Sequence, residues 1–326
     1  MEHPADLAYT DRYLHYSSGI SSSLYKPLVT TPTMALLKAL REAPRLLREQ
    51  PILFVPMAIF AVLQTPQLFL ETLDPIISLV GSLLVMALFV FITPVFYAGT
   101  IGIADDAAAG TPTSLGQFWS HVKEFYVSVL IAYLFITAAT FAFGVAISIV
   151  AVVAIVVFGA GGMEAVGLPV LLAAGGIFAL IVLAFVIALF AVHFYAHAIV
   201  IEGKGPVGGL SRSVHVVRHN IKPVIGYGLL SLVVGGLFGG LFALVISFAF
   251  PSAPAPGEPA PMPDLVPAIL GSGASILGTT LFMTFFVVFS VVFYRTLVGM
   301  EEDSSGSGAT MTDISADEFD SPNPSD

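Results

Sequence analysis

Four histidines and one glutamate are the side chains of this sequence best suited to chemistry. His193 and His197 are four residues apart near the end of a long apolar run, and His215 and His219 repeat this spacing in the polar stretch that follows. Residues four apart share one face of a helix, so each pair presents two imidazoles together. Zinc and similar metals take imidazole nitrogens and carboxylate oxygens. The pattern makes these four histidines, with Glu202 between the pairs, candidate metal ligands.

Two other roles suit the same histidines. They could form a pH-responsive cluster, or they could pack at the membrane boundary, since imidazole has an apolar body and a polar edge. A zinc protease would need His-Glu-x-x-His, and neither pair has Glu in that place. The sequence also contains no phosphate-binding glycine loop, no nucleophile elbow and no paired carboxylates. We therefore expect no enzymatic activity and no cofactor.

The composition places most of the chain in a membrane. Charged residues make up 10% of the chain and hydrophobic residues 56%, which is more apolar surface than a soluble domain can bury. Six long runs with few or no charges each exceed the roughly 20 residues that a spanning helix needs. The predicted spans are about 52–70, 76–100, 125–157, 168–200, 223–250 and 266–298. The predicted fold class is an all-α polytopic membrane protein with six transmembrane helices arranged as three helical hairpins.

The basic residues predict an orientation for these spans. All 12 Lys and Arg residues fall on one side of the six-span arrangement. Short loops that stay in the cytoplasm are rich in Lys and Arg. We therefore expect a multi-pass protein of the cell membrane with its N and C termini in the cytoplasm.

A similar segment precedes each odd-numbered span. Each segment opens with a proline, at Pro32, Pro112 or Pro206, and proline fits the first turn of a helix. Apolar residues then recur near helical spacing. This pattern predicts short amphipathic helices at the cytoplasmic surface before the odd-numbered spans.

Phe-Tyr dipeptides end the even-numbered spans at nearly equal intervals. They lie at 96–97, 194–195 and 293–294. Aromatic residues at such positions are typical of the headgroup level of a bilayer. The even spacing also suggests one unit used three times: surface helix, span, outer turn and span.

Two polar segments flank the predicted membrane domain, which covers residues 31–299. Residues 1–30 are polar, and we expect them to be poorly ordered. Residues 300–326 are acidic and contain no Lys or Arg, a composition that predicts a disordered acidic tail. The excess of acidic over basic residues also suggests a halophile with a salt-rich cytoplasm, although one acidic tail would explain it as well.

One inter-span segment carries a family resemblance. From Ala198 to Leu230, an apolar span end is followed by an acid-Gly-x-Gly-Pro turn, a Leu-x-x-Ser helix and a basic residue with Asn. The residues are Glu202, Gly203, Gly205, Pro206, Leu210, Ser213, Arg218 and Asn220. The pattern resembles a loose group of six-span membrane proteins. That group includes the membrane domain of some glycerophosphodiester phosphodiesterases and uncharacterised haloarchaeal membrane proteins. The resemblance implies the six-span architecture and no particular activity.

Three functions remain open at this point. The leading hypothesis is a non-catalytic membrane module that binds membrane lipids or another membrane protein, with no nucleic-acid partner. The first alternative is a transporter or channel for a neutral or lipid-like solute, and the second is a membrane metalloprotein that uses the paired histidines. Two overlaid small-xxx-small pairs in the fifth span could bring two helix backbones close together, within the chain or in an oligomer. They are formed by Gly235, Gly236, Gly239 and Gly240.

Overall fold

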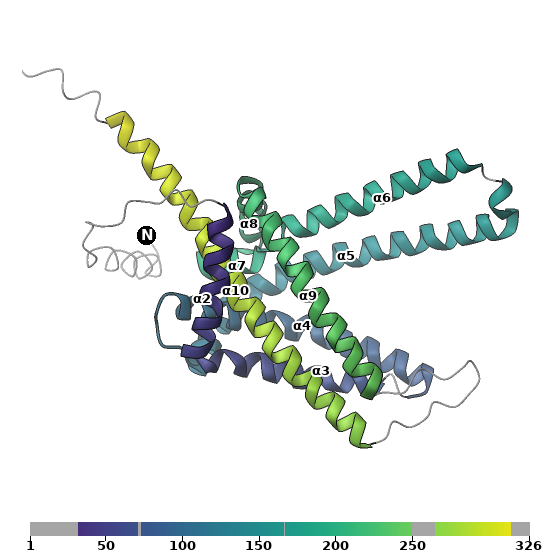
Figure 1. Ribbon diagram of the computed structural model, residues 1–326, viewed down its shortest axis with the longest axis horizontal. Coiled ribbons are helices and arrows are strands. Elements are labelled where there is room, and N and C mark those ends of the chain that lie inside the picture. The colour runs from purple at the N-terminus through teal and green to yellow at the C-terminus, as the bar shows by residue number, and fades with distance from the viewer. Residues whose placement is uncertain (1–31, 71–72, 166, 250–264, 314–326) are drawn as a thin grey trace, which may run out of the picture. The chain divides into compact units, whose positions relative to one another are not determined.

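The computed structural model describes residues 32–70, 73–165, 167–249 and 265–313, and every element in these ranges is a helix (Figure 1). In chain order they are α2 (Pro32–Glu49), the 3-10 helix η1 (Pro51–Leu53), α3 (Phe54–Leu70), α4 (Pro75–Ala108), α5 (Leu115–Ala165), α6 (Leu168–Ala191), α7 (Tyr195–Glu202), α8 (Pro206–His219), α9 (Ile221–Ala249) and α10 (Leu265–Asp313). Five of the described helices are long and apolar enough to cross a membrane, or six if the bent pair of α2 with η1 and α3 counts as one span. The all-α, multi-pass fold class is confirmed.

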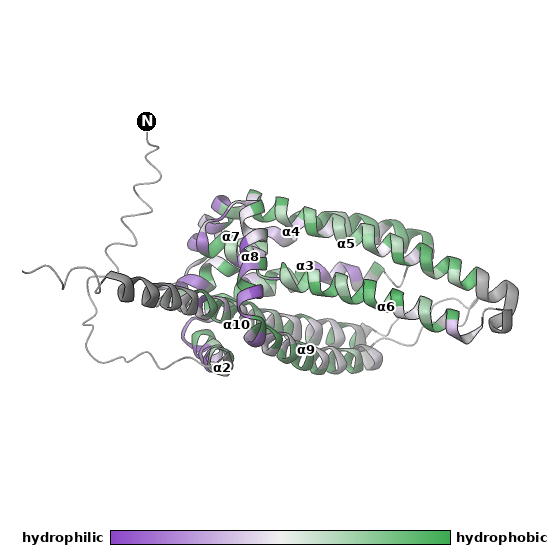
Figure 2. Ribbon diagram, turned by 90° about the horizontal axis from the view of Figure 1, so that it is seen from above, coloured by the Kyte–Doolittle hydropathy of each residue, from purple (hydrophilic) through white to green (hydrophobic). Residues whose placement is uncertain are grey.

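The observed helices follow the predicted spans in order. α3, α4, α5, α9 and α10 each cover one predicted span, and α6 with α7 covers the fourth. Figure 2 shows hydrophobic residues along α4, α5 and α6, and hydrophilic residues around α2, α7 and α8. We call the end where Arg48, Lys123, Lys222 and Arg295 lie the basic end. The opposite end, where α3 leads to α4, α5 to α6 and α9 to α10, is called the far end.

Two of the three predicted surface helices are separate elements. α2 meets the following helix at a bend of 97°, because Gln50 precedes Pro51 and lies outside the helical region, with φ −131° and ψ 75°. α8 ends at His219, four residues before Pro223, whose ring would clash with a helical carbonyl at that position.

The prediction of a separate surface helix before the third span is wrong. That segment forms the first turns of α5, which continues without a break for 51 residues. The physical reason is visible in the sequence, because no proline occurs between Leu115 and Ala165. The other two boundaries each have a proline where the span begins.

The C-terminal segment also differs from the sequence prediction. α10 continues as a helix to Asp313, so residues 300–313 are helical where the composition predicted disorder. Extending an existing helix is far easier than nucleating a new one, and the apolar part of α10 supplies that nucleus. Residues 1–31 and 314–326 lie outside the described residues.

α10 is the central helix of the bundle. It packs against α2, α3, α4 and α9, and Phe289, Phe293 and Tyr294 are among its fully buried side chains. Most residues of the Phe-Tyr dipeptides do not form the expected lipid-facing belt, because Phe194, Phe293 and Tyr294 are buried in the protein interior, whereas Tyr97 is exposed. The rings of Phe194 and Phe293 lie 6.1 Å apart. The repeated dipeptide therefore builds the core at the basic end.

Candidate functional site

A cavity of about 440 Å³, which we call the basic-end cavity, lies between α4, α5, α6, α7, α9 and α10. Its walls are mainly apolar and aromatic, and none of its lining residues is Asp, Glu, Lys or Arg. Hydroxyl and imidazole groups interrupt the apolar lining at eight positions. These are Tyr97, Tyr133, His193, Tyr195, His197, Tyr227, Ser231 and Ser290.

His197, which lines this cavity, has one ring nitrogen without a hydrogen-bond partner. The side chain is 7% exposed, and its Nε2 lies 2.8 Å from the Ser290 hydroxyl. That hydroxyl donates its proton to the Val287 carbonyl at 2.9 Å, so His197 Nε2 must be the donor of the pair. In neutral imidazole the other nitrogen is then an acceptor, and His197 Nδ1 has no hydrogen-bond partner.

Tyr195 presents a second unpartnered group. Its side chain is 7% exposed, and its hydroxyl makes no hydrogen bond. Tyr97 and Tyr133, which line the same cavity, lie with their ring centroids 6.3 Å apart. Together with Ser231, three side chains of the lining therefore have a buried polar atom without a hydrogen-bond partner: Tyr195, His197 and Ser231.

A break in the fourth span positions both side chains. The helix is interrupted between α6 and α7, which frees backbone groups that would otherwise bond within the helix. Ser213 of α8 satisfies two of them, since its hydroxyl accepts from the Phe194 N–H at 3.0 Å and donates to the Ala191 carbonyl at 2.9 Å. The Leu-x-x-Ser segment therefore secures the start of α7, which carries Tyr195 and His197.

Two ion pairs tie the hairpins together at the basic end. Arg212 Nε donates to both carboxylate oxygens of Glu202, at 3.1 and 2.9 Å, and the Tyr294 hydroxyl donates to the same carboxylate. Arg295 of α10 pairs with Asp105 of α4 at 2.7 Å. These contacts link α4, α7 and α8 to α10 beside the cavity.

The structure does not bring the candidate metal ligands together. His193 lies 3.2 Å from the Tyr227 hydroxyl, and Glu202 pairs with Arg212. His215 and His219 are exposed on α8 with their rings 4.0 Å apart. Within the described residues, no three His, Cys, Asp or Glu side chains are grouped so as to hold a metal ion. Only His193 and His197 share a site, and it is the basic-end cavity.

The glycine pairs of the fifth span are not packed within the described chain. A Cβ added to Gly236, Gly239 or Gly240 would meet no atom within 4 Å, and one on Gly235 would meet only Phe282, at 3.9 Å. The contact between chains that these glycines suggested stays a prediction.

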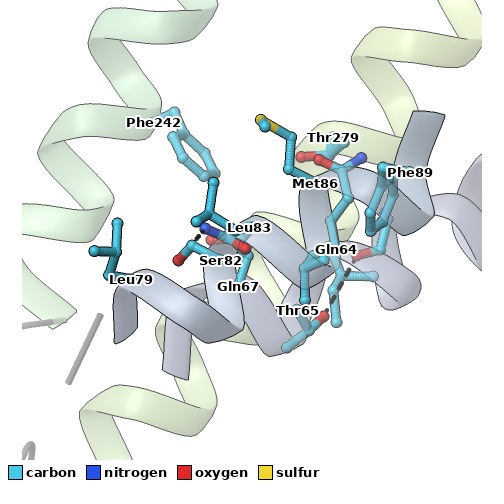
Figure 3. A pocket seen from close by; sticks show the side chains of 14 residues that line it. Gln64, Thr65, Gln67, Leu79, Ser82, Leu83, Met86, Phe89, Phe242 and Thr279 are labelled. Atoms are coloured by element: carbon cyan, nitrogen blue, oxygen red, sulfur yellow. Dashed lines mark hydrogen bonds between the residues drawn. The ribbon is translucent and has the colours of Figure 1, made fainter. Parts of the chain in front are cut away.

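A second cavity, which we call the far-end cavity, has a volume of about 550 Å³ and lies between α3, α4, α9 and α10 (Figure 3). Gln64, Thr65, Gln67, Ser82 and Thr279 are among its lining residues, together with apolar side chains. The Gln67 amide nitrogen donates to the Ser82 hydroxyl at 3.1 Å. This cavity also contains no charged lining residue.

Most of the residues that line these cavities could not be predicted from the sequence. Tyr97 and Tyr195 belong to Phe-Tyr dipeptides, so the repeat drew attention to two of the lining residues, but it did not indicate that they line a cavity. Gln64 and Gln67 could have indicated a polar site in the first span, since side-chain amides inside an apolar span need hydrogen-bond partners. Serine and threonine were only a weak signal, because they often bond to their own helix, as Thr140 does to the Ile136 carbonyl.

Comparison with known proteins adds a family and no activity. No curated protein and no solved structure matches the chain, and the resemblance to phosphodiesterase membrane domains stays a prediction. The model of one family, described as a domain of unknown function, matches residues 34–297. This range covers the α2–α10 bundle with both cavities, and the chain therefore belongs to the DUF7847 family.

Proposed function

We propose that this protein is a non-catalytic membrane module that binds an uncharged, hydroxyl-bearing lipid in the basic-end cavity. The observation that carries the proposal is two buried polar atoms without a hydrogen-bond partner, Tyr195 Oη and His197 Nδ1, on side chains that line a mainly apolar cavity. A buried polar atom without a partner costs about 1–3 kcal/mol. A ligand hydroxyl that bonds to either atom recovers that free energy.

The lining of the cavity selects for an uncharged molecule. No Asp, Glu, Lys or Arg lines it, and an unpaired charge in such surroundings is strongly disfavoured. Its volume of about 440 Å³ lies in the range of about 300–1,000 Å³ typical of small-molecule sites. Donor and acceptor are both present, because the Tyr195 hydroxyl can donate and His197 Nδ1 can accept. A headgroup with several hydroxyls uses both.

The native mass of the full-length protein, purified gently with its lipids, tests this function. We expect the chain mass plus one uncharged lipid. Tyr195→Phe removes one hydroxyl and no volume from the wall, and it should release that lipid, as should His197→Ala. Thr140→Val is the matched control, because its hydroxyl lies on exposed α5 and bonds within the helix. A wild-type chain without lipid, or variants that retain it as fully as the control does, would refute the proposal.

A second candidate function is transport of a neutral or lipid-like solute. The far-end cavity favours it, because a carrier needs more than one place along its spans where a polar group is accepted. This cavity offers amide and hydroxyl groups at a different depth of the same bundle.

The orientation with both termini in the cytoplasm is part of the proposal. It is supported by the basic residues, which include Arg48, Lys123 and Lys222 at one end of the bundle. The chain has no cysteine, so single cysteines can be introduced without interference. In intact cells, an impermeant maleimide should label Leu73→Cys at the far end and spare Ser211→Cys on α8. The reverse pattern would overturn the orientation.

A further inference from the structure

The two cavities lie on one face of α10. The far-end cavity is lined by Ser275 and Thr279, and the basic-end cavity by Phe282, Phe286 and Ser290. These positions follow one another at intervals of three or four residues, which keeps them on the same side of a helix. The two cavities therefore succeed each other along α10.

The two flanking helices show the same succession. On α4, Leu83 and Met86 line the far-end cavity, and Tyr97 and Ile101 line the basic-end cavity. Met86 and Tyr97 are eleven residues apart, about three helical turns, and so share a face. On α9, Phe242 lines the far-end cavity, while Tyr227 and Ser231 line the other. Both helices pack on α10.

One aromatic pair lies where the two cavities approach each other. Phe238 of α9 stacks on Phe282 of α10, with ring centroids 4.1 Å apart and an interplanar angle of 10°. Phe282 lines the basic-end cavity and is separated from Thr279 of the far-end cavity by less than one turn. This stack, which we call the Phe238–Phe282 pair, carries no polar atom.

We propose that the two cavities are successive stations of one path along α10, through which an uncharged, polyhydroxylated lipid headgroup such as a hexose passes between the two halves of the bilayer. The Phe238–Phe282 pair is the barrier between the stations. The proposal rests on the proposed lipid-binding function and adds a second station and a movement.

Hydrogen-bonding side chains without formal charge point to this headgroup. The path offers Gln64, Gln67 and Ser82 at one station and Tyr195 and His197 at the other. Amide, hydroxyl and imidazole groups can each bond to sugar hydroxyls, as donors or acceptors. A phosphate or carboxylate headgroup would meet no cationic partner among the lining residues of either cavity, so charged lipids should be excluded.

Lipid transfer in reconstituted vesicles tests the inference. The full-length protein is placed in phosphatidylcholine vesicles with a trace of NBD-labelled glucosylceramide, and added dithionite bleaches only the outer leaflet. We expect protein-dependent loss of the protected fluorescence for this probe and none for NBD-labelled phosphatidylserine. Phe282→Ala should raise the transfer rate about tenfold, equivalent to about 1.4 kcal/mol of barrier. Phe135→Ala, which removes an exposed ring of α5, should leave the rate unchanged.

A second variant distinguishes an effect on the path from misfolding of the protein. Thr279→Phe places a ring in the path of the far-end cavity and should slow transfer, so the two variants act in opposite directions. Equal transfer of glucosylceramide with and without protein would overturn the path. If lipid binding by native mass persists in that case, only the movement fails. If binding is lost as well, the proposed function fails with it.

Discussion

Two adjacent glycines of α8 provide a sharp test of how the site is held. Gly208 and Gly209 both lie within the helix and neither has a positive φ. A Cβ on Gly209 would lie 2.4 Å from Ile199 Cγ1 and 3.0 Å from the Tyr195 carbonyl oxygen. A Cβ on Gly208 would come no closer than 3.5 Å to another side chain, that of Lys204. Gly209 therefore has no room for a side chain against α7, whereas Gly208 does have room for one.

The expected changes in stability have opposite signs. Replacing glycine by alanine inside a helix stabilises it by about 0.5–1 kcal/mol, and Gly208→Ala should gain that amount. Gly209→Ala has the same intrinsic gain, but inserting a methyl group into a packed contact costs about 1–3 kcal/mol. The Tyr195 carbonyl belongs to the backbone, and Ile199 is branched at Cβ, so neither side of the contact can yield cheaply. The two variants should differ by about 1–3 kcal/mol, which is the overpacking cost.

Thermal or dodecyl-sulfate unfolding of the two purified variants measures this difference directly, because each serves as the control of the other. A shift of α7 also moves Tyr195, so Gly209→Ala should retain less lipid in the native mass measurement than Gly208→Ala. Equal stability of the two variants would refute the close contact between α7 and α8 and, with it, the account of how Tyr195 is positioned.

Further predictions concern the turn and the ion pair at the end of α7. Glu202→Gln should destabilise the protein by about 1.5–3 kcal/mol, the range for hydrogen bonds to charged groups. A double-mutant cycle with Arg212→Gln should recover part of that loss, and additive effects would contradict a direct pair. Gly203 ends α7 with φ 65°, so Gly203→Ala should cost about 1–2 kcal/mol. Gly205→Ala should cost little, because Gly205 has φ −68° and open space around it; unfolding curves of the two variants check this comparison.

The parts of the fold that sequence could predict are those set by local composition. Long charge-poor runs located five of the predicted spans, since a lipid environment demands length and apolarity from each segment alone. The first predicted span corresponds to α3, which forms a sixth only if its bent pair with α2 counts as one span. The continuous α5 was also predictable, because the absence of proline after Leu115 was visible. The proline that opens that segment, Pro112, favours a helix start, but only a second proline at the start of the span would have ended that helix. The salt-rich cytoplasm stays a prediction.

The candidate site depended on contacts between distant segments, and sequence could not supply them. His197 meets Ser290, and Glu202 meets Tyr294, across more than 90 positions of the chain. Nothing in the spacing of the histidines distinguished the pair that faces a cavity from the pair on the exposed face of α8. The Phe-Tyr repeat did not mark helix ends, since α4 continues to Ala108 and α10 to Asp313, and the burial of Phe194 and Phe293 depends on hairpins meeting at α10.

The charge-free walls of both cavities have an electrical consequence. Moving one elementary charge across a membrane potential of 100 mV changes its free energy by about 2.3 kcal/mol. An uncharged occupant moving past uncharged walls displaces no net charge, so the membrane potential does no work on it. Passage along α10 would be electroneutral. Its direction would then be set by the difference in lipid composition between the two leaflets, and collapse of the potential with an ionophore would leave it unchanged.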